Sequence, residues 1–185
     1  AFTGWQGRLD SMVYHKCTLD DIPRLRQMAE ITYRATFGPV NTQKDMDDYI
    51  NTAFSAQKLE SEILNPASAF YLGLEVQQPV GYIKLNLAPA QTEINDEDCM
   101  ELERIYVLPE QQGYGYGQQL LQKAIDMAEE QQKAYIWLGV WEKNEKAIGF
   151  YQKNGFYRFG QHLFCLGQDA QTDYLMRKDL KQKEC

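Results

Sequence analysis

One short stretch constrains this chain more than any other. Three alternating glycines, Gly113, Gly115 and Gly117, lie between a strand-like apolar run at residues 102–108 and an amphipathic helix that begins near the last glycine. The first N–H groups of a helix lack intrahelical partners and the helix dipole is positive there, so this junction predicts an anion-binding site. Glycines let the main chain approach an anion without an intervening Cβ.

The spacing of these glycines excludes two common phosphate-binding loops. A P-loop ends in Gly-Lys-Ser/Thr, whereas Gly117 is followed by Gln118 and Gln119. A dinucleotide-binding turn needs a G-x-G-x-x-G spacing, which the alternating glycines do not provide. The pattern that remains is Gln112-x-x-Gly115-x-Gly117 after a strand, and a glycine-rich turn without a ligand is the alternative interpretation.

The residues after the glycines predict a crossover to a parallel strand. One helical face is apolar and consists of Gly117, Leu120, Leu121, Ala124, Ile125 and Ala128. The nearly continuous apolar run at residues 135–141 is typical of a strand buried on both faces, as expected after a crossover helix. Residues 102–141 therefore predict one βαβ unit. A further helix follows, with Asn144 as its N-cap and Asn154-Gly155 as its stop signal.

The rest of the chain alternates between helical and strand patterns. The predicted helices cover residues 18–37, 41–54 and 55–64. The predicted strands cover residues 12–16, 71–76, 82–87, 156–166 and 173–178, with a hairpin turn at 77–79. This order predicts an α+β fold, in which a mostly antiparallel central sheet of about seven strands is flanked by helices and contains one parallel crossing at the anion loop.

Length and composition limit the possible functions. A chain of 185 residues predicts a single domain, placed at residues 11–185 after an irregular leader at 1–10. A net charge of −7 disfavours nucleic-acid binding and favours a cation, although solubility alone could explain it. No apolar run reaches the roughly 18 residues of a membrane span. Scattered cysteines and two isolated histidines predict free thiols, no metal site and a cytoplasmic location.

Two motifs resemble the GNAT acyltransferase superfamily. These are Gln112-x-x-Gly115-x-Gly117 and the segment Asn144-x-x-Ala-x-x-Phe-Tyr-x-x-x-Gly-Phe at residues 144–156, which occur in the expected order. The runs at 81–86, 101–107 and 136–145 are similar to PaiA-type polyamine acetyltransferases. The resemblance covers roughly residues 12–180. It implies the GNAT fold, acetyl-CoA as co-substrate, no metal, and acetyl transfer to a primary amine of spermidine or spermine by a monomer or homodimer.

The same resemblance implies how acetyl-CoA binds. The strand backbone would pair with the pantetheine amides, the glycine loop would hold the pyrophosphate, and a lysine would meet the adenosine phosphates. The cofactor-binding residues so implied are Ile105, Tyr106, Val107, Gln112, Gly113, Tyr114, Gly115, Tyr116, Gly117, Asn144 and Lys153. The loop departs from many relatives, which carry a Lys or His near the first glycine, and this departure removes positive charge near the phosphates.

Two residues are candidates for proton transfer. Tyr151 aligns with the superfamily tyrosine that protonates the departing sulfur, and a phenol with a pKa of about 10 suits that task; the alternative is a packed structural tyrosine. Strand alternation predicts that Glu103 shares a face with Ile105 and Val107, where burial would raise its pKa and suit it as a base acting through water. An ion pair with a neighbouring Arg or Lys is the alternative for Glu103.

The acceptor site is the least determined part. A polycation favours carboxylates and aromatic faces, and the early helices of GNAT folds wall the acceptor pocket. The candidate substrate-binding residues are Tyr33, Phe37, Asp48, Tyr49 and Trp141. A solvated helix face is the alternative for each of them. Acetylation of a protein amino terminus or lysine, and a CoA-binding regulator with little catalysis, are the competing functions.

Overall fold

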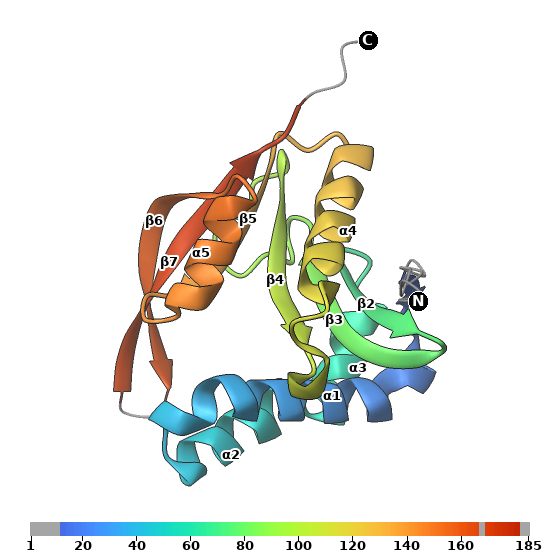
Figure 1. Cartoon of the computed structure of the whole chain (residues 1–185), viewed down its shortest axis with the longest axis vertical. Coiled ribbons are helices and arrows are strands. Elements are labelled where there is room, and N and C mark those ends of the chain that lie inside the picture. Colours follow the sequence, from blue (N-terminus) through green and yellow to red (C-terminus); the bar gives the residue numbers. More distant parts are fainter. Residues whose placement is uncertain (1–11, 167–168, 182–185) are drawn as a thin grey trace, which may run out of the picture.

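The central feature of the fold is one seven-stranded sheet with the order β1-β2-β3-β4-β5-β7-β6 (Figure 1). The structure is a computed structural model that describes residues 12–166 and 169–181, so the predicted leader lies outside the described residues. The strands are β1 Val13–Lys16, β2 Ser68–Glu75, β3 Gln78–Asn86, β4 Cys99–Val107, β5 Tyr135–Trp141, β6 Tyr157–Leu166 and β7 Asp169–Asp179. Only β4 and β5 pair in parallel among these strands, which confirms the predicted mixed sheet.

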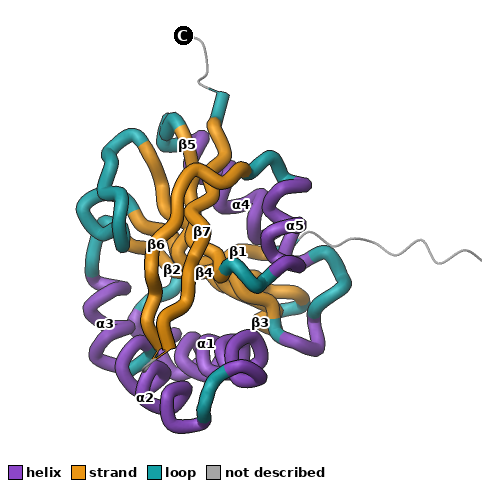
Figure 2. Tube along the Cα trace, turned by 90° about the vertical axis from the view of Figure 1, so that its left-hand side faces the viewer, coloured by secondary structure: helices purple, strands orange, loops and turns teal. Residues whose placement is uncertain are grey.

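Helices cover both faces of the sheet (Figures 1 and 2). The helices are α1 Ile22–Phe37, α2 Gln43–Ala53, α3 Ala56–Leu64, α4 Tyr116–Glu130 and α5 Glu145–Lys153, with short 3₁₀ turns η1 Leu19–Asp21, η2 Gly38–Val40 and η3 Pro109–Gln111. Apolar residues of α1, α2 and α3 form one core cluster with β2 and β3, and α4 forms a second with β3, β4 and β5. No helix in the described ranges has the length and apolar character needed to cross a membrane.

The strand β3 shows how the sequence pattern divides the two cores. Ile83 and Leu85 pack into the α4 core, whereas Tyr82 packs into the α1–α3 core, and this alternation confirms the predicted period of two. The preceding turn lies slightly earlier than predicted, because Val76 and Gln77 take positive φ angles of 47° and 64°. A two-residue turn with both central residues in this region matches the twist of a hairpin, so β3 begins at Gln78.

The parallel strands β4 and β5 separate soon after they pair. Their register covers only Cys99–Glu101 against Tyr135–Trp137, although β4 continues to Val107 and β5 to Trp141. Beyond this point β4 remains paired with β3, and β5 with β7. Among the described strands, none pairs with the facing edges of β4 and β5 where the two diverge.

A β-bulge corrects the predicted orientation of Glu103. Lys84 pairs with Arg104, but the next residue of β3 pairs with Leu102, so Glu103 is the extra residue in β4. Leu102 and Ile105 consequently both pack on the α4 side. Glu103 contacts Lys84, which lies on the face of β3 that bears Tyr82. The prediction that Glu103 shares a face with Ile105 and Val107 is wrong because simple alternation cannot anticipate a bulge.

Candidate active site

A cavity of about 950 Å³ fills the opening between β4 and β5. It is lined by the separated parts of both strands, by the glycine loop, by α1 and α2 on one side, and by α5 on the other. Most of the predicted site residues meet there: Tyr33, Phe37, Tyr49, Glu103, Ile105, Tyr106, Val107, Gln112, Gly113, Gly115, Tyr116, Gly117, Trp141, Asn144 and Tyr151. The predicted residues Tyr114, Asp48 and Lys153 are exposed and do not belong to the lining.

The glycine loop presents main-chain donors to one end of this cavity. Gly113 and Gly115 have φ angles of 87° and 84°, and Gly115 is the N-cap of α4. In the described structure, the N–H groups of residues 113–118 have no hydrogen-bond acceptor, and the first turn of α4 has no acidic side chain. A Cβ at Gly113 or Gly115 would meet no atom within 4 Å. The positive φ angles therefore favour glycine at both positions, and the unpaired N–H groups suit an anion.

The N-terminus of α5 lies beside the same cavity. Asn144 is its N-cap, and its Oδ1 accepts a hydrogen bond from the Ala147 N–H at 3.2 Å. This confirms the predicted helix start. The cap uses the side-chain oxygen, so the Asn144 amide NH₂ is left to donate toward the cavity that the residue lines.

Tyr151 lies on the cavity side of α5 in an aromatic environment. Its ring centroid is 5.4 Å from that of Phe150 and 5.8 Å from that of Phe156, and the residue is 8% exposed. Burial raises the pKa of the Tyr151 phenol. Its hydroxyl makes no hydrogen bond to any described residue, so it is a protonated and uncommitted donor at neutral pH.

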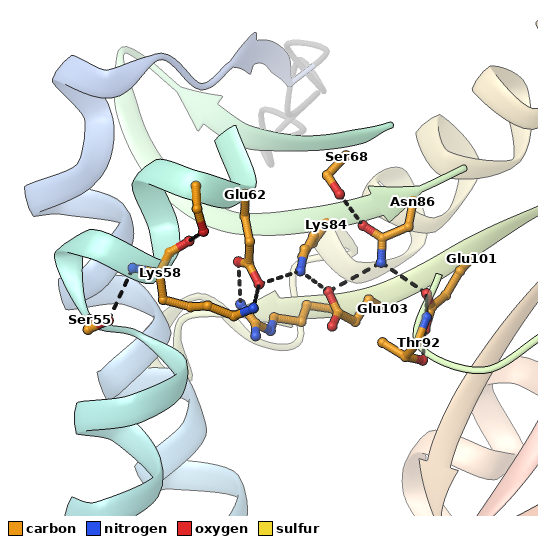
Figure 3. A network of polar contacts seen from close by, with 11 residues as sticks. Ser55, Lys58, Glu62, Ser68, Lys84, Asn86, Thr92, Glu101 and Glu103 are labelled. Carbon is orange, nitrogen blue, oxygen red and sulfur yellow. Dashed lines mark hydrogen bonds and ion pairs between the residues drawn. The ribbon is translucent and has the colours of Figure 1, made fainter. Parts of the chain in front are cut away.

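Glu103 belongs to a buried chain of charged and polar side chains (Figure 3). Its carboxylate forms an ion pair with Lys84, which is 4% exposed and also lies 3.0 Å from Glu62. Desolvation raises the pKa of Glu103, but the positive charges of Arg104 and Lys84 outweigh it and the net pKa is lowered. The expected rise in pKa is therefore wrong. The ion pair stabilises the charged form and makes Glu103 a weaker base.

A second carboxylate, Glu101, continues the chain toward the loop before β4. Glu101 is 2% exposed and accepts hydrogen bonds from Asn86 Nδ2 at 2.9 Å and from the Thr92 N–H at 2.9 Å (Figure 3). Burial raises its pKa, although these hydrogen bonds oppose the rise. Sequence reasoning missed Glu101 because the strand was predicted to begin at Leu102, whereas β4 begins at Cys99.

An aromatic wall lines the cavity on the α1 and α2 side. The ring centroids of Tyr49 and Tyr33 are 4.3 Å apart, those of Tyr33 and Phe37 are 4.6 Å apart, and those of Phe37 and Trp141 are 6.2 Å apart. The row thus runs from α2 through α1 to β5. Asp48 does not line the cavity and pairs with Lys44 at 2.6 Å, so the acidic residue predicted from α2 already has an ion-pair partner at the surface.

Several lining residues were not identified from the sequence. Arg104 is 10% exposed in its side chain and packs its guanidinium 4.8 Å from the Phe54 ring centroid. His162 on β6 and Asp173 on β7 also line the cavity. These two approach it only because β7 pairs with β5, a long-range contact that no local pattern reveals. No group of three or more potential metal ligands occurs among the described residues.

Comparisons with known proteins agree with this fold. The crystal structure of PaiA N-acetyltransferase from Thermoplasma acidophilum in complex with coenzyme A has the same fold, with a TM-score of 0.77 at 23% identity, covering 92% of this chain and 99% of that one. A spermidine N(1)-acetyltransferase from Thermoplasma acidophilum is 25% identical over 150 residues, which are 79% of this chain and 88% of that protein.

A third relative is more similar in sequence. An uncharacterized N-acetyltransferase in the pepI 3′ region of Lactobacillus delbrueckii subsp. lactis is 39% identical over 160 residues, covering 86% of this chain and 92% of the relative. The model of the acetyltransferase (GNAT) family matches residues 25–156, a segment that includes the glycine loop and both strands of the parallel pair. The chain therefore belongs to the acetyltransferase (GNAT) family.

Proposed function

We propose that this protein transfers the acetyl group of acetyl-CoA to a primary amine of a polyamine such as spermidine or spermine. The observation that carries the proposal is a single cavity that joins an anion-binding loop to an aromatic and acidic wall. The loop suits the diphosphate of CoA, and the wall suits a cationic amine. A spermidine N(1)-acetyltransferase among the relatives supports the same substrate class.

The proposed position of acetyl-CoA follows from the donors on the glycine-loop side. The N–H groups of residues 113–118 would hold the diphosphate. The pantetheine arm would lie along the free edge of β4 at Ile105, Tyr106 and Val107, adding to the sheet where the β4–β5 pairing has ended. Asn144 would donate its amide NH₂ to this arm. The thioester would then lie deep in the cavity beside Tyr151.

Direct transfer requires few steps at this position. A neutral amine attacks the thioester carbonyl, a C–N bond forms, and the C–S bond breaks. Tyr151 would give its phenolic proton to the leaving sulfur and regain one from solvent. Its raised pKa keeps the phenol protonated until the thiolate develops. We assign Glu103 an electrostatic role, because Lys84 and Arg104 hold it as a carboxylate.

The part of the cavity that would hold the acceptor favours a polyamine, which carries several positive charges, over a substrate without further charged groups. Ammonium groups bind well against aromatic faces, and the row from Tyr49 to Trp141 offers several of them along the cavity. Carboxylates of Glu103 and Asp173 also face this space. The net charge of −7 attracts polycations from solution.

Product analysis tests the proposal. Purified protein would be incubated with acetyl-CoA and with spermidine, spermine or a panel of peptides, and the products identified by mass spectrometry. We expect acetylated polyamine. Peptide acetylation with inert polyamines would instead support an acetyltransferase for protein amines, and acetyl-CoA binding without any acetylated amine would support a regulator.

A further inference from the structure

The acceptor end of the cavity holds a cluster of ionisable groups that the chemistry above does not use. His162 of β6 places its Nδ1 2.8 Å from Glu93 Oε2, which comes from the loop between β3 and β4. The other ring nitrogen, Nε2, lies 4.0 Å from Asp173 Oδ2 on β7. The His162, Glu93 and Asp173 side chains are 31%, 41% and 21% exposed, and His162 and Asp173 line the cavity.

This cluster adjoins the separated part of β5. A Cβ built on Gly139 would lie 3.9 Å from both Asp173 Oδ2 and His162 Cε1. Gly139 belongs to the segment of β5 that has left β4, and His162 and Asp173 both line the cavity. Because glycine has no side chain, nothing on Gly139 itself separates these two groups from the space between the strands. Trp141, two residues further along β5, contributes its ring to the same lining.

The electrostatic environment of His162 differs from that of Glu103. Glu103 is held by two cations, which stabilise its charged form. In the described part of the chain, the charged groups that contact His162 are the carboxylates of Glu93 and Asp173. Glu103 and Arg104 also line the cavity from β4, and Tyr33 on α1 interacts electrostatically with Asp173. Among the described residues His162 therefore contacts carboxylates and no cation, whereas the Glu103 carboxylate is already engaged by Lys84. His162 is the better placed of the two candidates to receive a proton from a substrate.

The geometry also leaves one ring nitrogen available. A carboxylate beside Nδ1 favours the tautomer with the proton on that nitrogen, although the N–H direction is not aligned for a hydrogen bond. The lone pair is then on Nε2. The 4.0 Å separation between Nε2 and Asp173 Oδ2 allows one ammonium nitrogen to lie within hydrogen-bond distance of both atoms.

We propose that the Asp173 carboxylate binds the ammonium group of the protonated acceptor amine and that His162 removes a proton from it. This inference rests on the proposed function. The ammonium transfers one proton to Nε2, and the freed nitrogen lone pair forms the C–N bond to the acetyl carbon. When the C–S bond breaks, the sulfur keeps the electron pair and takes the Tyr151 proton. The new amide nitrogen loses its second proton to water, and His162 returns its proton to solvent.

The test compares the two histidines of the chain, since it has only these two. His162→Gln and the control His15→Gln would be assayed with spermidine and acetyl-CoA across pH. His15 pairs with Asp21 and does not line the cavity, so its variant should keep the wild-type profile. We expect His162→Gln to lower kcat/KM at neutral pH by about 100-fold and to lose the rise in rate that accompanies imidazole deprotonation. A purely structural role would lower the rate equally at every pH.

A second measurement separates this inference from the proposed function. With two histidines, imidazole NMR signals can be assigned from the His15→Gln variant, and spermidine should shift the His162 signal and its titration while the His15 signal stays unchanged. Asp173→Asn should raise the KM for spermidine about tenfold while the KM for acetyl-CoA is unchanged. A His162→Gln variant with the wild-type pH profile would overturn the inference even if polyamine is acetylated. If the protein acetylates no amine, the proposed function fails, and an unresponsive His162 signal would overturn the inference as well.

Discussion

At the residue scale, Tyr151 combines burial with an uncommitted hydroxyl. The ring is held between two aromatic neighbours and its phenol has no described hydrogen-bond partner. Tyr151→Phe keeps the packing and removes only the proton donor. We expect kcat to fall by about 100-fold, which is the order expected for loss of a general acid. The Kd for acetyl-CoA, measured by calorimetry, should stay within about a factor of two. Unchanged turnover would exclude Tyr151 from protonating the sulfur.

Lys84, in contrast, is a buried charged residue to which we assign a role in stability and not in catalysis. It is 4% exposed and contacts both Glu103 and Glu62. Lys84→Met would remove the buried cation that contacts the largely buried carboxylates of Glu103 and Glu62 and would leave only Arg104 near both. We expect a loss of about 3 kcal/mol in the free energy of unfolding. Denaturant titration measures this loss.

Lys58 supplies a matched control for that substitution. It lies 3.3 Å from the same Glu62 carboxylate but is 53% exposed. Lys58→Met should cost less than about 1 kcal/mol, because exposed ion pairs contribute little. Equal losses for the two variants would contradict the view that burial makes Lys84 important.

The lowered pKa of Glu103 also predicts a pH dependence of stability. Cationic neighbours favour its charged form in the folded protein, whereas an unfolded glutamate titrates near pH 4.3, about the model-peptide value. The stability that Glu103 contributes is therefore fully present above that pH and is lost as pH falls through the lower folded pKa. The free energy of unfolding of Glu103→Gln should accordingly depend less on pH below about 5 than that of the wild type. The difference in slope should correspond to the loss of about one titrating group. Parallel curves for the two proteins would contradict this assignment.

At the element scale, the glycine loop and α4 form the part of the site that local chemistry determines. Gly115 has a φ of 84° and caps α4. Gly115→Ala should destabilise the protein by about 1 kcal/mol, because a side chain strains this conformation. The added methyl group would also face the diphosphate, and we expect the affinity for acetyl-CoA to fall at least tenfold by calorimetry, about 1.4 kcal/mol.

A glycine within α5 provides the control. Gly149 has open space around its Cβ position and does not have a positive φ. Gly149→Ala should raise the free energy of unfolding by about 0.5–1 kcal/mol through helix propensity and leave acetyl-CoA binding unchanged. Loss of binding in both variants would indicate a general effect of glycine replacement and not a loop-specific one.

The elements show where sequence reasoning succeeds. The 3.6-residue apolar period of α4, the cap at Asn144 and the alternation in β3 are local signals, and all three correspond to the structure. The bulge at Glu103 depends on how β3 and β4 align, so alternation within one strand placed Glu103 on the wrong face. The same contact with β3 supplies Lys84 and reverses the expected pKa shift.

At the scale of the whole molecule, the site exists because β4 and β5 diverge. One side of the opening receives the glycine loop and α5, and the other receives α1, α2 and the β6–β7 hairpin (Figure 2). The motifs predicted residues on the first side, because a glycine-rich turn and a helix cap are local sequence patterns. They could not identify His162 or Asp173, whose proximity to Gly139 depends on the pairing of β5, β7 and β6.

Ligand binding across this opening should stabilise the whole fold. If acetyl-CoA contacts β4, the loop and α5 together, it binds only the folded state. Acetyl-CoA at a concentration of about 100 times its Kd should then add about 2.7 kcal/mol to the free energy of unfolding. Thermal unfolding with increasing acetyl-CoA measures this effect, and Gly115→Ala should reduce it. Spermidine added with CoA should raise the midpoint further if the two ligands occupy the cavity simultaneously. No further rise would argue against a shared cavity.

The most direct test of the account is a crystal structure of the protein with CoA and spermidine. The account predicts the CoA diphosphate on the N–H groups of residues 113–118, the sulfur beside the Tyr151 hydroxyl, and a primary amine of spermidine between the aromatic wall and the Asp173 carboxylate. A diphosphate bound away from the glycine loop, or a polyamine bound outside the opening between β4 and β5, would contradict it.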